Sequence, residues 1–444
     1  MNSIKIVQTA KDTTDRLAEK EVALATEKSS KGTVIKVESD KTFQEIIGFG
    51  GAFTEAAAYT LSKMEPAKRE EIIKKYFDVE EGIGYTIGRV HIHSCDFALG
   101  NYTYVEEGDK ELITFDISHE QKWVIPFIKE AMKKSNNEIK LLASPWSPPA
   151  WMKTNGEMNH GGQLLPEYRE AWARYYAKFI KAMRAEGLNI WSITVQNEPA
   201  ATQTWDSCIY SAEEEGAFVR DYLGPILEEE GLSDVNIYIW DHNRDIIVER
   251  AKGVLEDKEA AKYVYGVANH WYVSEAFENL SKVHELYPDK HILFSEGCME
   301  GGVKIGTWSH GEAYARNMIG DFNNWQEGWL DWNLVLDEIG GPNHVGNYCD
   351  APIIADTKTQ EIHYNSSYYY IAQFSKYVKP GAKRIAVEAL EQTEVKYVGF
   401  KNTDGQAVII LLNETNEEQS VNVQLKDKFV AYTMPAHSIA TLLV

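Results

Sequence analysis

Short apolar runs alternate along the chain with longer amphipathic segments. The amphipathic segments carry apolar residues at the three-to-four spacing of a helix face. One of them begins at Pro166 and ends at Gly187, which are typical start and stop residues of a helix, and another predicts helical structure over 55–77. The runs that we interpret as strands are 44–53, 85–93, 139–146, 190–199, 236–243, 263–272, 291–298 and 327–336.

Eight strand–helix units in succession predict a (β/α)8 barrel, because eight is the number of strands that closes this fold. An open doubly wound sheet also alternates strands and helices. It is disfavoured because the first strand, with GFGGAF at 48–53, lacks the last glycine of a phosphate-binding loop.

The two ends of the chain read differently from its middle. From about residue 383 onward, short apolar runs are separated by turn clusters such as 402–405, and two further strand-like runs occur in the first 40 residues. Neither end is long enough to form a stable core alone. We therefore predict a β-sandwich assembled from residues 1–43 and 381–444, packed against a barrel of residues 44–380.

Composition narrows the classes of partner. The 444 residues carry 45 Lys and Arg against 67 Asp and Glu, a net charge of −22, which disfavours nucleic acid and anionic membrane surfaces. No apolar stretch is long enough for stable membrane insertion. Four cysteines without a CxxC pair predict reduced thiols. The N-terminus lacks the apolar segment of a signal peptide, so we expect a cytoplasmic location.

Two glutamates dominate the predicted strand ends, where a barrel of this kind carries its chemistry. Glu198 lies in VQNEP and Glu296 in LFSEGC, at the ends of the fourth and seventh strands. Opposed carboxylates are what cleavage of a glycosidic bond requires. Asn197 supplies an amide for a sugar hydroxyl, and Pro199 predicts an extended conformation at Glu198. A single strand-end glutamate would more simply be a solvated loop residue; the pair favours catalysis.

Other strand ends add groups that suit this chemistry. Arg89 is a candidate partner that keeps Glu296 ionised, with a structural ion pair as the alternative. His270 and Tyr272 share one strand face and could both hold a carboxylate, although a packed core histidine is the competing interpretation. A cluster of aromatic residues suits the apolar face of a sugar. The remaining strand-end candidates are Asp96, Asp241 to Asn243, Trp146, Trp151 and Trp332.

A metal or cofactor is not predicted. His91 and His93 resemble a barrel metal pair, but further ligands are not placed on neighbouring strands. Cys298 follows Glu296 by two residues, yet no adjacent base is evident, so a packed thiol is the simpler interpretation.

Several motifs together resemble glycoside hydrolase family 30, and most closely its branch of lysosomal glucosylceramidase and bacterial relatives. They run in family order from about residue 45 to 380: GFGGAFTEAAA, EGIGYTIGRVHIHSCDF, LLASPWSPPAWMKTNG, TVQNEP, HWY, SEGC, GWLDWNLVL and GGPNHVGNYCDAPII. The resemblance implies a retaining β-glycosidase with Glu198 as acid/base and Glu296 as nucleophile. The pocket residues that it implies are Arg89, Asp96, Trp146, Asn197, His270, Tyr272, Trp332 and Asn347, the last of which spacing alone does not reveal.

The expected function is therefore exo-acting hydrolysis of β-glucosidic bonds in a sugar or glycolipid, including a role in sphingolipid breakdown, by double displacement through a covalent glycosyl-enzyme. Within the family, a β-1,6-glucanase or a β-xylosidase remains open, because loops set the subsites. From other classes, a non-catalytic carbohydrate-binding barrel and a metal-dependent barrel hydrolase also remain open.

Overall fold

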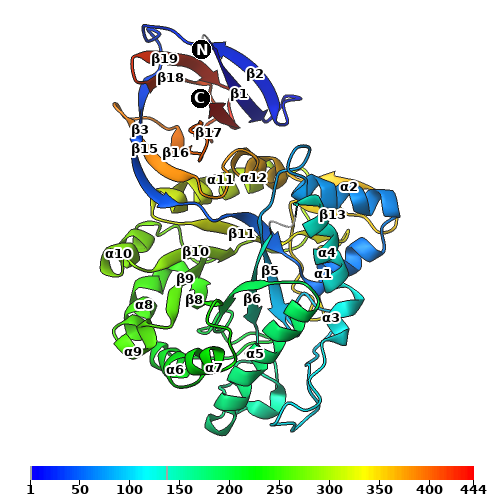
Figure 1. Ribbon diagram of the computed structural model, residues 1–444. Coiled ribbons are helices and arrows are strands. Elements are labelled where there is room, and N and C mark those ends of the chain that lie inside the picture. The colour runs from blue at the N-terminus through cyan, green and yellow to red at the C-terminus, as the bar shows by residue number, and fades with distance from the viewer. Residues whose placement is uncertain (1–2, 137–138) are drawn as a thin grey trace.

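Eight parallel strands close into a barrel at the centre of the computed structural model, which describes residues 3–136 and 139–444 (Figure 1). The strands pair in chain order, and the last pairs with the first. Each strand falls within one of the predicted apolar runs, so the (β/α)8 fold is confirmed. The barrel strands are β4 (Gly48–Ala52), β5 (Ile87–Ile92), β6 (Lys140–Pro145), β7 (Ile190–Thr194), β8 (Asn236–Asn243), β9 (Val264–His270), β10 (His291–Glu296) and β11 (Gly328–Asn333).

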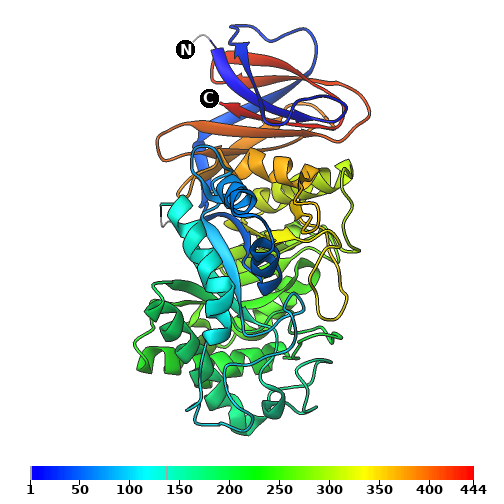
Figure 2. The ribbon, with the colours of Figure 1, turned by 90° about the vertical axis from the view of Figure 1, so that its right-hand side faces the viewer.

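Helices surround the barrel (Figures 1 and 2). The α-helices are α1 (Glu55–Ser62), α2 (Pro66–Phe77), α3 (Ser118–Lys122), α4 (Val124–Lys134), α5 (Arg169–Ala185), α6 (Ala212–Phe218), α7 (Gly224–Glu229), α8 (Ile247–Leu255), α9 (Lys258–Ala261), α10 (Glu278–Leu286), α11 (Trp308–Asn323) and α12 (Ser366–Ser375). Single turns of 3-10 or π type complete the set: η1 (Ala150–Met152), η2 (Pro166–Tyr168), η3 (Val219–Leu223) and η4 (Arg244–Ile246). In the described part of the chain, no helix is both long and apolar enough to cross a membrane.

Local sequence explains where the helices begin and end. Residues 55–77 form two helices, because Pro66 has no N–H for a continuous helix and instead occupies the first turn of α2. The helix α5 ends as predicted, two residues before Gly187, whose φ of 82° suits a glycine. Its predicted apolar face is buried, which fixes α5 against the barrel. That face consists of Trp172, Tyr175, Tyr176, Phe179, Ile180 and Met183.

Both chain ends contribute to a β-sandwich beside the barrel (Figure 2). Its nine strands run in the order β19-β18-β3-β15-β16-β17-β20-β1-β2, with β1 antiparallel to β20, and they enclose a separate apolar core. The sheet packs on α11 and α12, as the hydrogen bond from Gln373 on α12 to Thr9 on β1 illustrates. The strands are β1 (Ser3–Ala10), β2 (Ala18–Ala23), β3 (Thr33–Glu45), β15 (Lys383–Ala389), β16 (Lys396–Lys401), β17 (Ala407–Asn413), β18 (Gln419–Leu425), β19 (Lys428–Met434) and β20 (Ser438–Leu443).

A small three-stranded sheet lies in the loop region after β11. It consists of β12 (Val335–Leu336), β13 (Ile353–Ala355) and β14 (Ile362–Tyr364). The chain between β12 and β13 carries Asn343 and Asn347, so this sheet anchors a loop that reaches the pocket described below.

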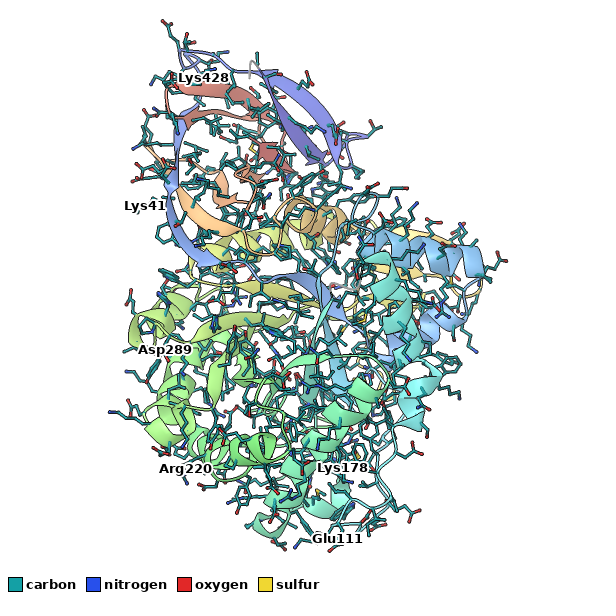
Figure 3. All side chains as sticks on the ribbon, in the orientation of Figure 1. Lys41, Glu111, Lys178, Arg220, Asp289 and Lys428 are labelled. Atoms are coloured by element: carbon teal, nitrogen blue, oxygen red, sulfur yellow. The ribbon has the colours of Figure 1, made fainter. Side chains whose placement is uncertain are left out.

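Side chains are drawn over the whole ribbon in Figure 3. Within the barrel they pack into a core and do not line a pore. Toward the amino ends of the strands these side chains form an apolar layer: Ile87, Leu142, Tyr238, Ala268, Leu293 and Leu330. Two residues further along most strands, the inward position is polar. The pairs Ile87 and Arg89, Ala268 and His270, and Leu293 and Ser295 show this change. The fold therefore places its polar groups at the carboxyl ends of the strands.

Candidate active site

A pocket of about 140 Å³ opens at the carboxyl ends of the barrel strands. Eight of the ten predicted site residues line it, and the other two, Arg89 and His270, lie beneath it in contact with the glutamates. The lining residues are Asp96, Trp146, Asn197, Glu198, Gln203, Trp205, His242, Asn243, Tyr272, Glu296, Cys298, Glu300, Trp332, Asn347 and Cys349.

The two glutamates face each other across this pocket. Glu198 follows β7, and Glu296 is the last residue of β10. One carboxylate oxygen from each glutamate and one ring nitrogen of His270 lie within 4.8 Å of one another. A sugar carbon bound between the two carboxylates would therefore be reached by both.

Glu296 is held by two donors. Nη1 of Arg89 donates to Oε2 over 2.6 Å, and the Tyr272 hydroxyl donates to Oε1 over 2.9 Å. Arg89 is fully buried, so its position is fixed by these contacts and by packing over the ring of Trp146. Burial raises the pKa of Glu296, and the positive charges of His270 and Arg89 oppose that rise.

Glu198 is contacted by two histidines from neighbouring strands. Nδ1 of His270 lies 3.3 Å from its Oε1, and Nε2 of His242 lies 3.6 Å from the same atom. Burial acts to raise the pKa of Glu198, but the His270 hydrogen bond and both histidines hold it below its ordinary value.

The backbone at Glu198 differs from the prediction. Its φ of 49° lies in the left-handed region, whereas the following Pro199 predicts an extended residue. The backbone N–H of Glu198 donates to the carbonyl of Asp241, which ties this strand end to β8 and holds the unusual conformation in place. Such strained residues persist where the surrounding structure determines them, and they concentrate at active sites.

His270 is protonated and contacts both Glu198 and Asp241 through its ring nitrogens. Burial acts to lower its pKa, but Glu296 and the hydrogen bonds to Asp241 and Glu198 raise it to about 9. His270 is therefore a cation at neutral pH, with one ring nitrogen facing Glu198.

The far wall of the pocket suits a sugar ring. The indoles of Trp146 and Trp332 stack with centroids 5.2 Å apart and form an apolar surface. Opposite polar atoms come from Asp96, whose Oδ2 accepts hydrogen bonds of 3.2 Å from both Asn343 and Asn347. Burial, reinforced by Glu296, raises the pKa of Asp96 to about 8. Near neutral pH this carboxyl is protonated and can both donate and accept.

Some pocket residues escaped the sequence analysis. Gln203 and Trp205 lie in the long loop after β7 and Glu300 in a later loop, and no periodicity or motif marked them. Cys349 lies within the family motif at 340–354 but was not singled out as a pocket residue. Trp151, predicted at the rim, instead packs edge-on against Tyr168 and does not line the pocket.

The predicted packed thiol, Cys298, is buried and lines the pocket wall. Its Sγ lies 3.5 Å from the Tyr272 hydroxyl. A hydrogen bond with Cys349, together with burial, raises the pKa of Cys298 well above its ordinary range, which makes it a poor nucleophile.

The histidine pair considered as a metal site serves the core. Both ring nitrogens of His93 are engaged by Tyr175 and the Ser147 carbonyl, and His91 accepts a hydrogen bond from the backbone of Glu55. Within the described ranges, one group of at least three potential ligands converges: Glu198, His270 and Glu296. The adjacent Arg89 and the protonated His270 put positive charge there, which disfavours a cation.

Comparison with known proteins gives consistent matches over nearly the whole chain. The model of the glycosyl hydrolase family 30 TIM-barrel domain matches residues 46–378, and that of the family's beta sandwich domain matches residues 381–442. The chain is 37% identical to the putative glucosylceramidase 4 of Caenorhabditis elegans over 440 residues, covering 95% of this chain and 84% of that protein. It is 35% identical to the lysosomal acid glucosylceramidase of Mus musculus over 440 residues, covering 95% and 85%.

Solved structures agree with these matches. SrfJ from Salmonella typhimurium superposes with a TM-score of 0.96 at 37% identity, covering 100% of this chain and 99% of that one. An endo-beta1,6-glucanase superposes with a TM-score of 0.91 at 30% identity, with the same coverage.

Proposed function

The chain belongs to glycosyl hydrolase family 30, and within that family we propose that it is a retaining, exo-acting β-glucosidase of the glucosylceramidase type. The observation that carries this proposal is the pair of glutamates whose oxygens lie within 4.8 Å across a pocket of about 140 Å³.

The separation of the glutamates supports retention of configuration. Retaining glycosidases place their carboxyl groups about 5–5.5 Å apart, whereas inverting enzymes need about 6.5–9.5 Å to admit a water between carboxylate and sugar. In the proposed first step, Glu296 attacks the anomeric carbon while Glu198 protonates the leaving oxygen. In the second step, Glu198 takes a proton from water, and that water displaces Glu296 from the sugar.

The surroundings of Glu296 fit the role of nucleophile, and those of Glu198 hold its carboxyl in position. Arg89 and Tyr272 donate to both oxygens of Glu296, which favours its ionised, nucleophilic form. Glu198 lies 3.3 Å from the protonated His270, and this contact orients its carboxyl. Glu198 gives its proton to the leaving oxygen in the first step and regains one from the attacking water in the second.

The size of the pocket supports exo action. The pocket is small, about 140 Å³, which suits one terminal sugar better than a run of several sugars. Asp96 and Asn347 line the pocket, and Asn343 and Asn347 both donate to Asp96. In the proposed binding mode, Asp96 and Asn347 form hydrogen bonds to outer hydroxyls of that sugar. Asn197 lies beside Glu198 and is placed to contact the hydroxyl next to the reacting carbon.

Exposed residues on the loops after the barrel strands support an apolar leaving group. Several large apolar side chains are exposed on the loops that follow the barrel strands, and Val273 is 63% exposed directly after the pocket residue Tyr272. These residues suit an alkyl or lipid aglycone. They are Leu99, Val273, Ile305, Ile339 and Tyr348.

A second candidate is β-1,6-glucanase activity, which the 30% identity to the solved endo-beta1,6-glucanase favours. Pocket residues near Glu198, namely Gln203, Trp205 and Asn243, could bind a second sugar instead of a lipid.

One set of assays separates these possibilities. Purified enzyme is tested on aryl β-glucoside, β-xyloside, β-galactoside and β-fucoside, then on gentiobiose, β-1,6-glucan and glucosylceramide. Proton NMR follows the anomer released first from the aryl glucoside. We expect the glucosides to be preferred, β-glucose to appear first, and glucosylceramide to be turned over faster than β-1,6-glucan. Cleavage of long β-1,6-glucan into oligosaccharides would support the second candidate, and α-glucose appearing first would refute retention.

A further inference from the structure

Asp241 is a third carboxylate directly beneath the catalytic pocket, and the reaction described above gives it no contact with the sugar. It is fully buried and absent from the pocket lining. Its Oδ1 accepts hydrogen bonds from His270 Nε2 over 2.9 Å and from Ser295 over 2.5 Å. Its Oδ2 accepts from Arg89 Nη2 over 2.8 Å and from Thr194 over 2.7 Å.

The chain adopts an unusual conformation to bring Asp241 to this place. Strict alternation from the inward-facing Tyr238 would point Trp240 into the barrel and Asp241 outward. Instead, the pairing of β8 with β9 shifts register between Trp240 and His242, and Trp240 and Asp241 have φ values of 71° and 54°. Trp240 then packs under the Arg250 guanidinium among the outer core residues. Bulges of this kind commonly re-aim a side chain beside an active site.

We propose that Asp241 is a positioning residue that holds both catalytic carboxylates at once, through Arg89 to Glu296 and through His270 to Glu198. This inference rests on the proposed function of the two glutamates. Each arm has two contacts: Asp241 to Arg89 to Glu296 at 2.8 and 2.6 Å, and Asp241 to His270 to Glu198 at 2.9 and 3.3 Å.

Charge explains why a carboxylate is needed at this point. The pKa of Asp241 lies far below its ordinary value, because Arg89 and the hydrogen bonds of His270 and Ser295 outweigh its burial. The resulting negative charge stabilises two buried cations, Arg89 and His270, each of which also contacts one catalytic glutamate. A neutral amide of the same shape would leave the His270 proton weakly held, so Glu198 would lose the charged hydrogen-bond partner that positions it.

His270 is surrounded by titratable groups from the neighbouring strands. A test must therefore distinguish the titration of His270 from the titration of these groups. The groups that face it are Arg89 on β5, Glu198 after β7, Asp241 and His242 on β8, Tyr272 after β9, and Glu296 on β10. Replacing Asp241 changes its own contacts to Arg89, His270, Ser295 and Thr194 and leaves the other titratable groups in the sequence unchanged.

A second buried arginine–aspartate pair supplies a matched control. Arg244 and Asp321 are both fully buried and lie 2.5 Å apart, and Asn317 also bonds the guanidinium. This pair touches neither glutamate. If burial of an ion pair were the only role of such an aspartate, Asp241→Asn and Asp321→Asn would behave alike.

The direct test is histidine NMR on protein labelled with ¹⁵N-histidine, using His270→Gln to assign the signal. In the wild-type enzyme we expect His270 to remain protonated up to a pH of about 9. In Asp241→Asn its titration should move down by about 1–3 pH units, whereas in Asp321→Asn it should not move. An unchanged His270 titration in folded Asp241→Asn would overturn the proposal.

Kinetics tests the coupling to both steps. We expect kcat of Asp241→Asn to fall by about 100-fold or more on an alkyl glucoside, less on a dinitrophenyl glucoside that needs no proton, and Asp321→Asn to stay within about twofold of wild type. Equal losses of kcat on both glucosides would show that Asp241 does not act on Glu198 through His270. The NMR result does not depend on turnover, so failure of the proposed function and failure of this inference are distinguishable.

Two milder variants test the proposal if Asp241→Asn does not fold. Ser295→Ala and Thr194→Val each remove one donor to Asp241 without changing charge. We expect each to lower kcat by about 3- to 30-fold with KM nearly unchanged. Wild-type kinetics in both variants would contradict a positioning role.

Discussion

The lower and upper halves of the barrel interior are built on the same strands but hold opposite kinds of side chain. The lower half is an apolar layer that includes Leu142 and Leu293. One inward position further along, the upper half holds Arg89, Asp241 and His270, all fully buried and joined by short hydrogen bonds. Burial of apolar area stabilises without regard to direction, whereas buried polar groups are tolerated only when each is paired. Stability and chemistry are therefore separated along the barrel axis.

Mutations in the two layers should therefore have different effects. A change in the lower layer should weaken folding while the folded molecules keep their chemistry. A change in the upper layer should damage chemistry first, because the geometry of each hydrogen bond matters there. The following variants test this separation, beginning with the largest effect on turnover.

Glu296→Ala should abolish nearly all activity. It removes the atom that forms the covalent intermediate, so kcat should fall by about 10⁴-fold or more on aryl and alkyl glucosides alike. Steady-state kinetics with both substrates gives the result. A melting curve checks that the variant is folded, since Arg89 loses one of its two carboxylate partners. Substantial turnover in this variant would assign the nucleophile elsewhere.

Glu198→Ala should fail selectively. We expect losses of about 10²–10⁴-fold on an alkyl glucoside, whose leaving group needs a proton, and much smaller losses in the first step with a dinitrophenyl glucoside. Added azide should restore turnover of the dinitrophenyl substrate, because a small anion can attack the glycosyl-enzyme without base assistance. Equal losses on both substrates, with no rescue by azide, would show that Glu198 is not the acid/base.

Arg89→Met should move the pH profile. Arg89 lowers the pKa of Glu296 against the effect of burial, so its loss raises that pKa. The ionised nucleophile then forms only at higher pH, and the acidic limb of kcat/KM should shift upward. Activity at the new optimum should still be about tenfold lower or worse, because the hydrogen bond is also lost. If folded Arg89→Met keeps its acidic limb, Arg89 is a structural ion-pair partner.

Leu142→Ala tests the lower layer and should change turnover least. The truncation leaves a cavity beneath the site and should cost about 2–5 kcal/mol of unfolding free energy, measured by urea denaturation. The kcat per folded molecule should stay within about twofold of wild type. A variant that is stable yet slow would show that the two layers are not separable.

Much of this arrangement could be predicted from sequence, for identifiable reasons. Each barrel strand is a short apolar run, so all eight were found within their predicted ranges. Glu198 and Glu296 were found because they end such runs. Arg89 and His270 were also found as candidates because each lies near the end of such a run. Apolar runs and the residues that end them are local features, so they can be recognised in the sequence without knowledge of tertiary contacts.

The parts that were missed depend on irregular backbone or on loops. Asp241 was noted only as a strand-end residue, since its inward direction comes from a bulge that no periodicity reveals. The left-handed Glu198 contradicts what Pro199 predicts, because the hydrogen bond to the Asp241 carbonyl overrides the local preference. Gln203 and Trp205 reach the pocket through a loop whose path is set by tertiary contacts.

The central claim is double displacement at Glu296, and trapping the intermediate tests it most directly. A 2-fluoro-2-deoxy-β-glucoside with a good leaving group slows the second step more than formation of the glycosyl-enzyme, so the covalent species accumulates. Peptide mapping by mass spectrometry should then place one fluoroglucosyl group on Glu296, and none should form in Glu296→Ala. A label on Glu198, or turnover with inversion and no label at all, would contradict the account.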